Sequence, residues 1–289
     1  MTDQLGSTER RLEGVNQFSA VISAIRGMAA VRLNEAERRL DGITAFAATI
    51  AQAIGEAIAL LPQAVPAPGQ PSADQAHLLI ALCSEHGFVG GFNAHVLDTV
   101  ERLLAEQPGP FELFFVGSRG ATEAKERGLE TSGTLPTASH AEEVMTLANR
   151  MAEELYRRLD APGIGQVTLV HAIPGQRGAD CARKLLIPFD YGRFPKATPG
   201  EPPLINLAPA DLLEALALEY VFAEISEAIM LSYAAENEAR MYAMLSASAN
   251  ITRKQAELTA LVRRLRQEKI TAEVIELAVG TLAGEADLS

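Results

Sequence analysis

Apolar residues recur at alternating steps of three and four along residues 8–60. This spacing is typical of the narrow seam of a coiled coil rather than the broad apolar face of a globular-domain helix, and it predicts a helix over this range. The glycines within it each weaken a helix by about 1 kcal/mol relative to alanine, so the helix needs a partner along its length. The seam positions are Val15, Phe18, Ile22, Ile25, Ala29, Ala36, Leu40, Ile43, Ala47, Ile50, Ile54, Ile58 and Leu61.

A second long helix is predicted near the other end of the chain. Residues 210–279 contain neither Gly nor Pro, Pro209 and Gly280 bound them, and apolar residues recur through them at helical spacing. As one helix they would extend about 105 Å at 1.5 Å per residue, much longer than an ordinary compact domain is wide. Two such helices at opposite ends of the chain predict an antiparallel helical hairpin with arms at 1–61 and 210–286.

The middle of the chain has a different pattern, in which short apolar runs alternate with helical spacing. Strands are predicted at 77–83, 111–117, 165–173 and 182–188, and helices at 93–106, 119–127 and 140–160. This alternation predicts a small parallel or mixed sheet, and Pro-rich linkers at 61–75 and 194–209 flank it. The predicted fold class is therefore α/β plus a long coiled coil, with a Rossmann-like α/β domain at 76–190 inserted between the arms of the hairpin.

Charge is distributed unevenly along the predicted C-terminal helix. The net charge of the chain is −12, which argues against nucleic acid as the main partner. Residues 204–245 hold seven acids and one base, a net charge of −6, whereas residues 253–269 hold six bases and two acids, a net charge of +4. Two readings stay open: a solvated helix of uneven charge, or a rod whose two halves face different surroundings.

The sequence gives little indication of a membrane-spanning segment, a signal peptide or disulfide bonds. No apolar run approaches the roughly 18 residues that cross a bilayer, and residues 1–14 lack the apolar segment of a signal peptide. The two cysteines, Cys83 and Cys181, sit in apolar runs. This setting favours free buried thiols in a cytoplasmic protein over a disulfide framework.

One glycine-rich turn, CSEHGFVGGFN at 83–93, lies between a predicted strand and a predicted helix. A phosphate-binding turn would need the Lys of a Walker loop or the G-x-G-x-x-G of a dinucleotide site. Gly87, Gly90 and Gly91 are spaced G-x-x-G-G, and no Lys follows them. The residues themselves therefore favour a tight turn with Asn93 capping the next helix, and a nucleotide site is the weaker alternative.

Catalytic and metal-binding signatures are missing from the sequence. The five histidines, at 77, 86, 95, 140 and 171, show no metal-ligand spacing, and there is neither a G-x-S-x-G nor an H-E-x-x-H motif. Cys83, His86 and Asp98 could form a site, but a buried thiol and a surface histidine are commoner explanations. We expect no catalytic, cofactor or metal site, and a non-catalytic coiled-coil adaptor remains an alternative.

The turn resembles a motif of the F-type ATP synthase gamma subunits, S-D-R-G-L-C-G-G-L-N, at a strand–turn–helix junction. Ser84, Gly87, Gly90, Gly91 and Asn93 match it. Residues 239–244, ARMYAM, resemble the family's A-R-M-x-A-M, and residues 266–273 are similar to its R-Q-x-x-I-T-x-E. Residues 11–33 also align with the family's opening helix, so the resemblance covers nearly the whole chain.

The sequence departs from this family at two places. Glu85, His86 and Val89 replace the Asp, Arg and Cys of the turn, and residues 17–23 replace the usual N-T-x-K-I-T-K of the first helix. These departures suggest a divergent branch, such as the alternate ATPases that some bacteria carry beside an ordinary copy. The coupling ion is selected by carboxylates of other subunits, so this sequence does not report it.

The resemblance implies a rotor shaft without catalytic activity of its own. Its implied partners are the alpha3-beta3 hexamer, the epsilon subunit and the c-ring of the membrane sector, with no nucleic acid and no direct membrane insertion. It implies a peripheral location at the cytoplasmic face of the inner membrane and no cofactor. The implied beta-subunit contacts are Ile25, Arg32, Arg266, Gln267, Thr271 and Glu273, and the implied docking turn near the foot comprises Ser84, Gly87, Gly90, Gly91 and Asn93.

Overall fold

A computed structural model describes residues 2–61, 72, 75–107, 109–161, 163–175, 180–194 and 203–286 of the 289 in the chain, with the side chains of 2–3 and 277–286 left aside. Most of the first predicted Pro-rich linker, 61–75, and half of the second, 194–209, lie outside these residues. The elements in order are α1 (Thr2–Ala59), β1 (Ala76–Leu82), α2 (Phe92–Glu106), β2 (Phe111–Val116), α3 (Ser118–Glu126), β3 (Gly133–Leu135), the 3-10 helix η1 (Ala141–Glu143), α4 (Val144–Leu159), β4 (Ile164–Ile173), β5 (Asp180–Ile187), the 3-10 helix η2 (Tyr191–Arg193) and α5 (Pro209–Ala286).

The sheet is mixed. Its strand order is β3-β2-β1-β4-β5, in which β1 pairs in parallel with both β2 and β4, and β2 pairs in parallel with β3. β4 and β5 are antiparallel. The two parallel pairs that are consecutive in the chain, β1–β2 and β2–β3, are joined through α2 and α3, as a parallel connection requires. The predicted strands are confirmed, but the prediction missed β3, whose three residues are too few to produce an apolar alternation.

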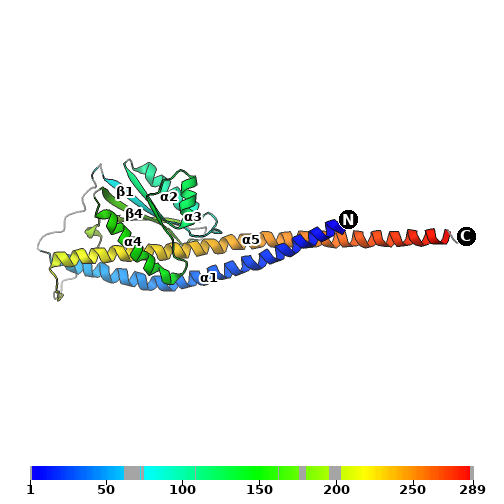
Figure 1. Ribbon diagram of the computed structural model, residues 1–289. Coiled ribbons are helices and arrows are strands. Elements are labelled where there is room, and N and C mark those ends of the chain that lie inside the picture. Colours follow the sequence, from blue (N-terminus) through cyan, green and yellow to red (C-terminus); the bar gives the residue numbers. More distant parts are fainter. Residues whose placement is uncertain are drawn as a thin grey trace. The chain divides into compact units, whose positions relative to one another are not determined.

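Both faces of the sheet are covered, which explains why its central strands read as continuous apolar runs. Leu79 and Phe115 point into a cluster with α2 and α3. On the other face, Leu78 and Phe114 pack in a cluster with α4 and with residues of α1 and α5. Figure 1 shows α2 and α3 on one side of the sheet and α4 on the other.

The chain forms two compact units, residues 1–28 with 242–289, and residues 29–241. In the first unit, Gln255 donates a hydrogen bond to Asn16, and Arg266 forms an ion pair with Glu9. In the second unit, residues of α1 and α5 pack together at two places. One contains Ala36, Leu40, Ile225 and Ile229. The other contains Ile54, Ala57, Leu212 and Leu213.

The predicted seam of α1 is only partly buried. Ile22, Ala29, Ala36 and Ile54 are at most 6% exposed, as a seam requires. Phe18 is 61% exposed, so its assignment to the seam is wrong. Its side chain instead borders a groove between α1 and α5 in the first unit, because a residue at the edge of a narrow seam falls outside the contact with the partner helix.

One helix among the described residues, Gln4–Ala59 within α1, is long and apolar enough to cross a membrane by length and composition. Its most apolar window has a mean hydropathy of 1.3, and 17% of that window is buried. The expectation that no apolar run reaches this length is therefore wrong. A single such helix is weak grounds for a membrane span, because the core helix of a soluble protein and a signal sequence pass the same test.

Candidate functional site

The glycine-rich turn after β1 is tight, as the sequence predicts. Gly90 has φ = +58°, in the left-handed region that glycine enters without steric cost. Phe88 has φ = +64°, an uncommon conformation for a residue with a side chain. That side chain is 66% exposed. The turn thus combines two left-handed residues with an aromatic ring held in solvent.

Asn93 does not cap α2, so the predicted capping role is wrong. Helix α2 begins at Phe92, after Gly91, and no side chain caps it. Asn93 lies inside the first turn, 1% exposed, and its Oδ1 accepts a hydrogen bond of 2.9 Å from the backbone N–H of Ser84. A cap must stand before the first helical residue, and Asn93 comes two positions too late. It instead ties the end of β1 to α2.

The glycines that other atoms pack against most closely here lie outside the turn, at Gly117 and Gly120. A Cβ at Gly91 would touch only the ring of His95, at 3.5 Å, and one at Gly87 would meet nothing within 4 Å. A Cβ at Gly117 or Gly120, by contrast, would overlap Cys83. The sequence analysis missed these two glycines, although G-S-R-G directly after the apolar run FELFFV was the available signal.

Glu85, one of the departures from the family motif, fastens the turn to two other segments. Its carboxylate accepts hydrogen bonds from the backbone N–H of Ser118 at 3.1 Å, the hydroxyl of Ser118 at 2.6 Å, and the N–H of Thr137 at 3.1 Å. Burial acts to raise the pKa of Glu85, but these hydrogen bonds outweigh it and lower the pKa. Glu85 is therefore held as a carboxylate anion. It links the turn after β1 to the N-terminus of α3 and to the segment after β3.

The position of α5 argues against a nucleotide at this turn. In open α/β sheets, ligands bind outside the carboxyl ends of the strands where the strand order reverses, which here is at β1 and β4. Ala235 and Ala239 of α5 pack in one cluster with Cys83 at the end of β1. Glu238 of α5 accepts a hydrogen bond of 2.9 Å from Gly175 after β4. Helix α5 thus occupies the place where a nucleotide would lie.

The Cys83, His86 and Asp98 combination does not form a reactive site. Cys83 is 2% exposed, and burial strongly raises the pKa of its thiol, which stays protonated and unreactive. The carboxylate of Asp98 is paired with Arg127 at 2.6 Å. Across the part of the chain that the structure describes, no group of three or more His, Cys, Asp and Glu side chains could hold a metal ion.

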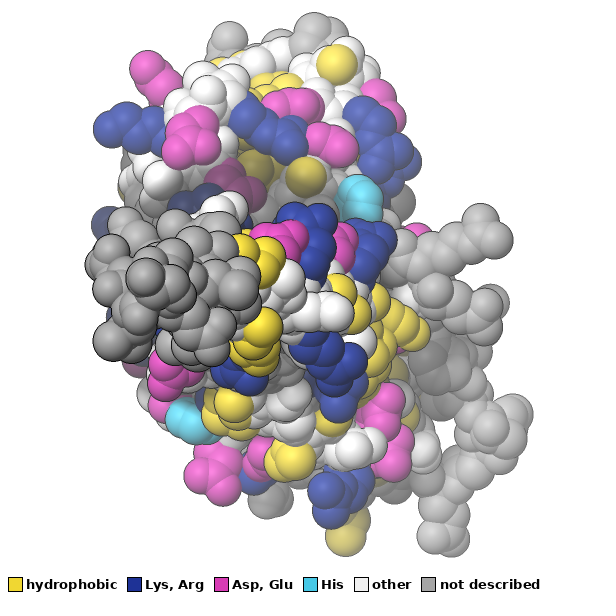
Figure 2. Space-filling view, turned by 90° about the vertical axis from the view of Figure 1, so that its right-hand side faces the viewer, with side chains coloured by type: hydrophobic (Ala, Val, Ile, Leu, Met, Phe, Trp, Pro, Cys, Tyr) yellow, Lys and Arg dark blue, Asp and Glu magenta, His cyan; other side chains and the backbone are white. Residues whose placement is uncertain are grey.

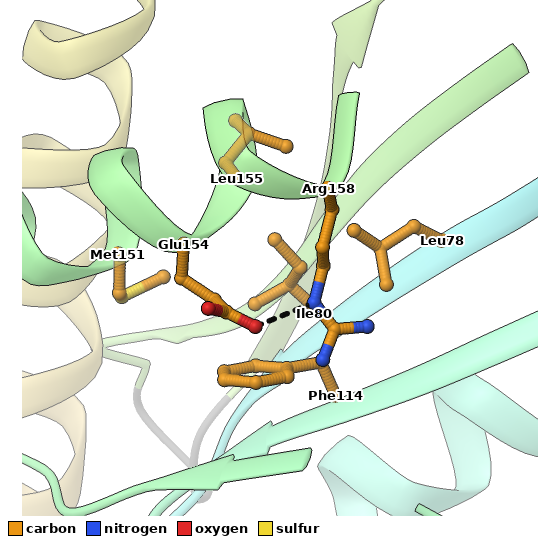
Figure 3. A pocket seen from close by; sticks show the side chains of 7 residues that line it. All are labelled: Leu78, Ile80, Phe114, Met151, Glu154, Leu155 and Arg158. Atoms are coloured by element: carbon orange, nitrogen blue, oxygen red, sulfur yellow. Dashed lines mark hydrogen bonds and ion pairs between the residues drawn. The ribbon is translucent and has the colours of Figure 1, made fainter. Parts of the chain in front are cut away.

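A second charged cluster surrounds Arg158 of α4 (Figure 3). Its guanidinium donates to Glu154 at 2.7 Å, to Glu112 at 2.9 Å and to the carbonyl of Ser132 at 3.1 Å, and it lies 4.9 Å from the ring centre of Phe114. The cavity beside it has about 10 Å³ of usable volume, room for one water molecule at most. Arg158 therefore fastens α4 to the edge of the sheet and does not bind a ligand.

The acidic stretch of α5 meets bases of the α/β region. Lys184 of β5 donates to Glu227 at 2.6 Å, and Arg193 donates to Glu224 at 3.0 Å. Part of the negative charge of residues 204–245 is therefore neutralised by ion pairs with Lys184 and Arg193. On the face shown in Figure 2, Lys and Arg side chains likewise lie next to Asp and Glu side chains rather than in one patch of a single sign.

Four of the predicted contact residues lie exposed in the last part of α5. Arg266 donates two hydrogen bonds to one oxygen of Glu9, at 2.6 and 3.1 Å, with 62% of its side chain exposed. Thr271 donates to the carbonyl of Gln267, and Glu273 lies 3.6 Å from Lys269. Ile25 belongs to the same unit, whereas Arg32 belongs to the other.

A family model described as ATP synthase matches residues 4–283. The chain belongs to this family. The protein is similar to the ATP synthase gamma chain of Solibacter usitatus (strain Ellin6076), with 28% identity over 225 residues and 72% of each chain covered. It is 24% identical over 278 residues to the ATP synthase gamma chain of Moorella thermoacetica, covering 94% of this chain and 96% of that one. The gamma chains are a non-catalytic component of the ATP synthase complex.

Solved structures of the same family share the fold. A chain in the cryo-EM structure of the Euglena gracilis mitochondrial ATP synthase (OSCP, F1 and c-ring, rotational state 3) matches with a TM-score of 0.67 and 15% identity. The match covers 100% of this chain and 97% of that one. A chain of the rotor from the same organism matches with a TM-score of 0.63 over 93% of this chain. The mixed sheet and the long C-terminal helix are therefore features of an ATP synthase central-stalk fold.

Proposed function

We propose that the protein is the central rotor shaft, the gamma subunit, of an F-type ATP synthase or ATPase. In this role it couples ion flow through the membrane sector to ATP synthesis or hydrolysis at the beta subunits. The observation that carries the proposal is the family match over residues 4–283, nearly the entire chain. The location of α5 at the ends of β1 and β4 disfavours the alternative of an enzyme with a nucleotide site.

The proposed architecture is an antiparallel helical hairpin with an inserted Rossmann-like α/β domain. Glu9 pairs with Arg266 and Asn16 with Gln255, so residue numbers fall along α5 as they rise along α1. The order of the parallel strands, with the reversal beside β1, supports the Rossmann-like description. The proposed parts are the N-terminal arm 1–61, the α/β domain 76–190 and the C-terminal arm 210–286.

The proposed partners are the alpha3-beta3 hexamer, the epsilon subunit and the c-ring of the membrane sector. The related Euglena gracilis assembly contains F1 and a c-ring, which supports this assignment. The protein would be a peripheral component of the F1 sector at the cytoplasmic face of the inner membrane. Identities of 24–29% to the gamma chains reported above and to similar bacterial ones are consistent with a divergent branch of the family.

The proposed contacts with the beta subunits are Ile25, Arg32, Arg266, Gln267, Thr271 and Glu273. The last four are exposed along α5, so a surrounding ring could reach them. The turn is proposed as a docking surface near the foot of the shaft. Within it, Gly87, Gly90 and Gly91 would meet the partner, whereas the buried Ser84 and Asn93 would hold the turn in shape.

The function is tested by replacing Arg266 with Ala and Gln267 with Leu in the assembled complex. We expect ATP turnover to fall several-fold while the chain stays bound to the ring, because a shaft contact is lost without loss of the hairpin. Arg264→Ala is the matched control, since Arg264 is an equally exposed base of α5. Turnover and ion pumping at the parent level in the double variant would show that these residues are not the contact.

A further inference from the structure

Two acids of α5 and two bases of the α/β region form a chain of alternating charges. Lys184 of β5 donates to Glu227 at 2.6 Å, and its Nζ lies 3.8 Å from one carboxylate oxygen of Glu224. Arg193 of η2 donates to the other oxygen of Glu224 at 3.0 Å. The side chain of Glu224 is 6% exposed, and those of Lys184 and Glu227 are 24% and 25% exposed. Salt therefore screens this charge ladder, the four residues just named, less than it screens a surface pair.

Aromatic rings hold Arg193 in the charge ladder. Its guanidinium carbon lies 5.2 Å from the ring centres of Phe189 and Phe194, and 4.9 Å from that of Tyr220. Tyr220 belongs to α5, one turn before Glu224, and its ring packs edge-on against Phe194 with the ring centres 4.8 Å apart. A cation is attracted to the face of an aromatic ring, and a planar guanidinium stacks on such a face better than an ammonium does. The rings therefore keep Arg193 against α5.

A third carboxylate continues the line along the same side of α5. Glu238 accepts a hydrogen bond of 2.9 Å from the backbone N–H of Gly175, which follows β4. At about 100° and 1.5 Å per residue, Glu224, Glu227 and Glu238 fall within roughly 60° of one another and extend about 21 Å along the helix. One face of α5 is therefore tied by directional bonds to β5, to η2 and to the end of β4.

The contacts of α1 with the α/β region are of a different kind. Leu40 and Ile43 of α1 pack against the apolar cluster that contains residues of the sheet and α4. In the part of the chain that the structure describes, one hydrogen bond joins α1 to the α/β region, from Arg39 to Glu142, and these side chains are 43% and 77% exposed. Apolar contacts are not directional, and an exposed ion pair contributes little. Neither fixes the angle of α1 against the sheet as the bonds to α5 do.

We propose that the charge ladder transmits twist between the α/β domain and the shaft, with Lys184 and Arg193 as positioning residues and α5 as the helix that receives the load. The inference rests on the proposed function, in which the α/β domain turns together with the c-ring, and it adds which residues carry the twist. Rotation of the domain about α5 would separate opposite charges that lie within about 4 Å of each other, so the ladder resists it. The apolar contacts with α1 resist sliding less.

The test measures how stiffly the α/β domain is held in the assembled complex. The ring is fixed to a surface, and a bead is bound to Glu126→Cys at the exposed end of α3, in chains that also carry Cys181→Ser. The variance of the bead angle during pauses in rotation reports the stiffness. Lys184→Glu brings like charges together at Glu227, and we expect the variance to rise several-fold. Lys184→Glu combined with Glu227→Lys restores opposite charges and should return the variance to the parent level.

Two further charge reversals are the matched controls. Arg183→Glu changes the neighbouring residue of β5 and breaks an exposed ion pair with Glu106, away from α5. Arg39→Glu breaks the pair between α1 and Glu142. We expect both to leave the variance at the parent level. A control that raises the variance as much as Lys184→Glu, or a combined variant that does not restore it, would overturn the proposal.

A milder pair of variants covers the case in which Lys184→Glu does not assemble. Lys184→Met keeps the length of the side chain and removes its charge, and Arg183→Met is its control. We expect a larger variance in the first than in the second, and equal values would overturn the proposal while leaving the rotor assignment intact. Failure of the parent chain to assemble with the ring, or a bead that does not rotate while the complex hydrolyses ATP, would instead contradict the proposed function itself.

Discussion

The backbone of the glycine-rich turn contains two residues with positive φ, Phe88 and Gly90. Gly90 sits at φ = +58°, where a side chain with a Cβ collides with the backbone and costs roughly 1–2 kcal/mol. Phe88 tolerates nearly the same angle, which means that the surrounding contacts of Glu85, Ser84 and Asn93 hold the turn in place. A substitution at Gly90 would add strain to a turn that already contains one strained residue.

Gly90→Val is therefore expected to lower the free energy of unfolding by about 1–2 kcal/mol or more, because valine is branched at Cβ and strongly disfavours positive φ. Gly87→Ala is the control, since a Cβ there meets nothing within 4 Å. Urea denaturation of the full-length chain measures both. If the two variants unfold at the same urea concentration, backbone strain at Gly90 does not set the stability of the turn.

Glu154 gives a prediction about acid stability. Hydrogen bonds from Arg157 and then Arg158 lower its pKa from the ordinary 4.5 to about 2. Because the pKa of Glu154 is lower in the folded chain, the interactions of its carboxylate with Arg157 and Arg158 stabilise the fold above pH 4.5. This stabilisation is lost as the pH falls from 4.5 toward 2. Glu154→Gln should flatten the pH dependence of the melting temperature in this window. The neighbouring, exposed Glu153→Gln should leave it unchanged, and equal curves for both variants would rule out this origin of acid sensitivity.

The role that the sequence suggested for Asn93 differs from the one in the structure. Asn93 accepts a hydrogen bond from Ser84 across the turn, and it does not cap α2, because the first helical residue lies one position before it. Glu85 and Gly117 were missed for a different reason. Their importance comes from contacts with segments distant in the sequence, and no local pattern contains that information.

At the scale of the elements, α5 contains a buried ion pair in its central part. Arg240 donates to Glu236 at 2.6 Å, and the two side chains are 10% and 9% exposed. Burial raises the pKa of Glu236, and the charge of Arg240 acts in the opposite direction. A charge buried with its partner removed is costly, whereas replacing both partners with apolar residues need not be.

Arg240→Ala is expected to cost about 3–5 kcal/mol of unfolding free energy, because Glu236 would be left buried without a partner. The double variant Glu236→Leu with Arg240→Met should recover most of this loss. Calorimetry or denaturant unfolding of the full chain can compare the two. A double variant no more stable than Arg240→Ala would mean that the pair contributes through its hydrogen bonds and not only through charge neutralisation.

Element positions followed from periodicity because long helices and buried strands repeat their signal many times. The strand predicted at 111–117 is observed at Phe111–Val116, and the helix predicted at 93–106 begins one residue earlier. β3 and the two 3-10 helices have three residues each, too few to show a period. Phe18 was misplaced because periodicity finds the apolar side of a helix but not the edge where its contact ends.

For the whole molecule, the division into two units predicts uneven stability in the isolated chain. The unit of residues 29–241 contains the sheet and its two clusters. The other unit exposes large apolar side chains that include Phe18, Val21, Met28, Ile270 and Val274. We expect amide hydrogens near 1–30 and 250–286 to exchange faster than those of the sheet, and to become protected on assembly. Equal protection of both regions in the lone chain would contradict this.

The composition of α5 has a mechanical consequence. The helix runs from Pro209 to Ala286, and its residues 210–279 include neither glycine nor proline, whereas α1 contains Gly6, Gly14, Gly27, Gly42 and Gly55, each of which favours the helix less than alanine does. When the helix pair is twisted, α5 therefore has no glycine or proline between residues 210 and 279 at which it would kink first. Torsional compliance would concentrate in α1 and in the side-chain contacts between the helices. Replacing Gly42 of α1, where a Cβ would meet nothing within 4 Å, with alanine should therefore raise the torsional stiffness of the helix pair.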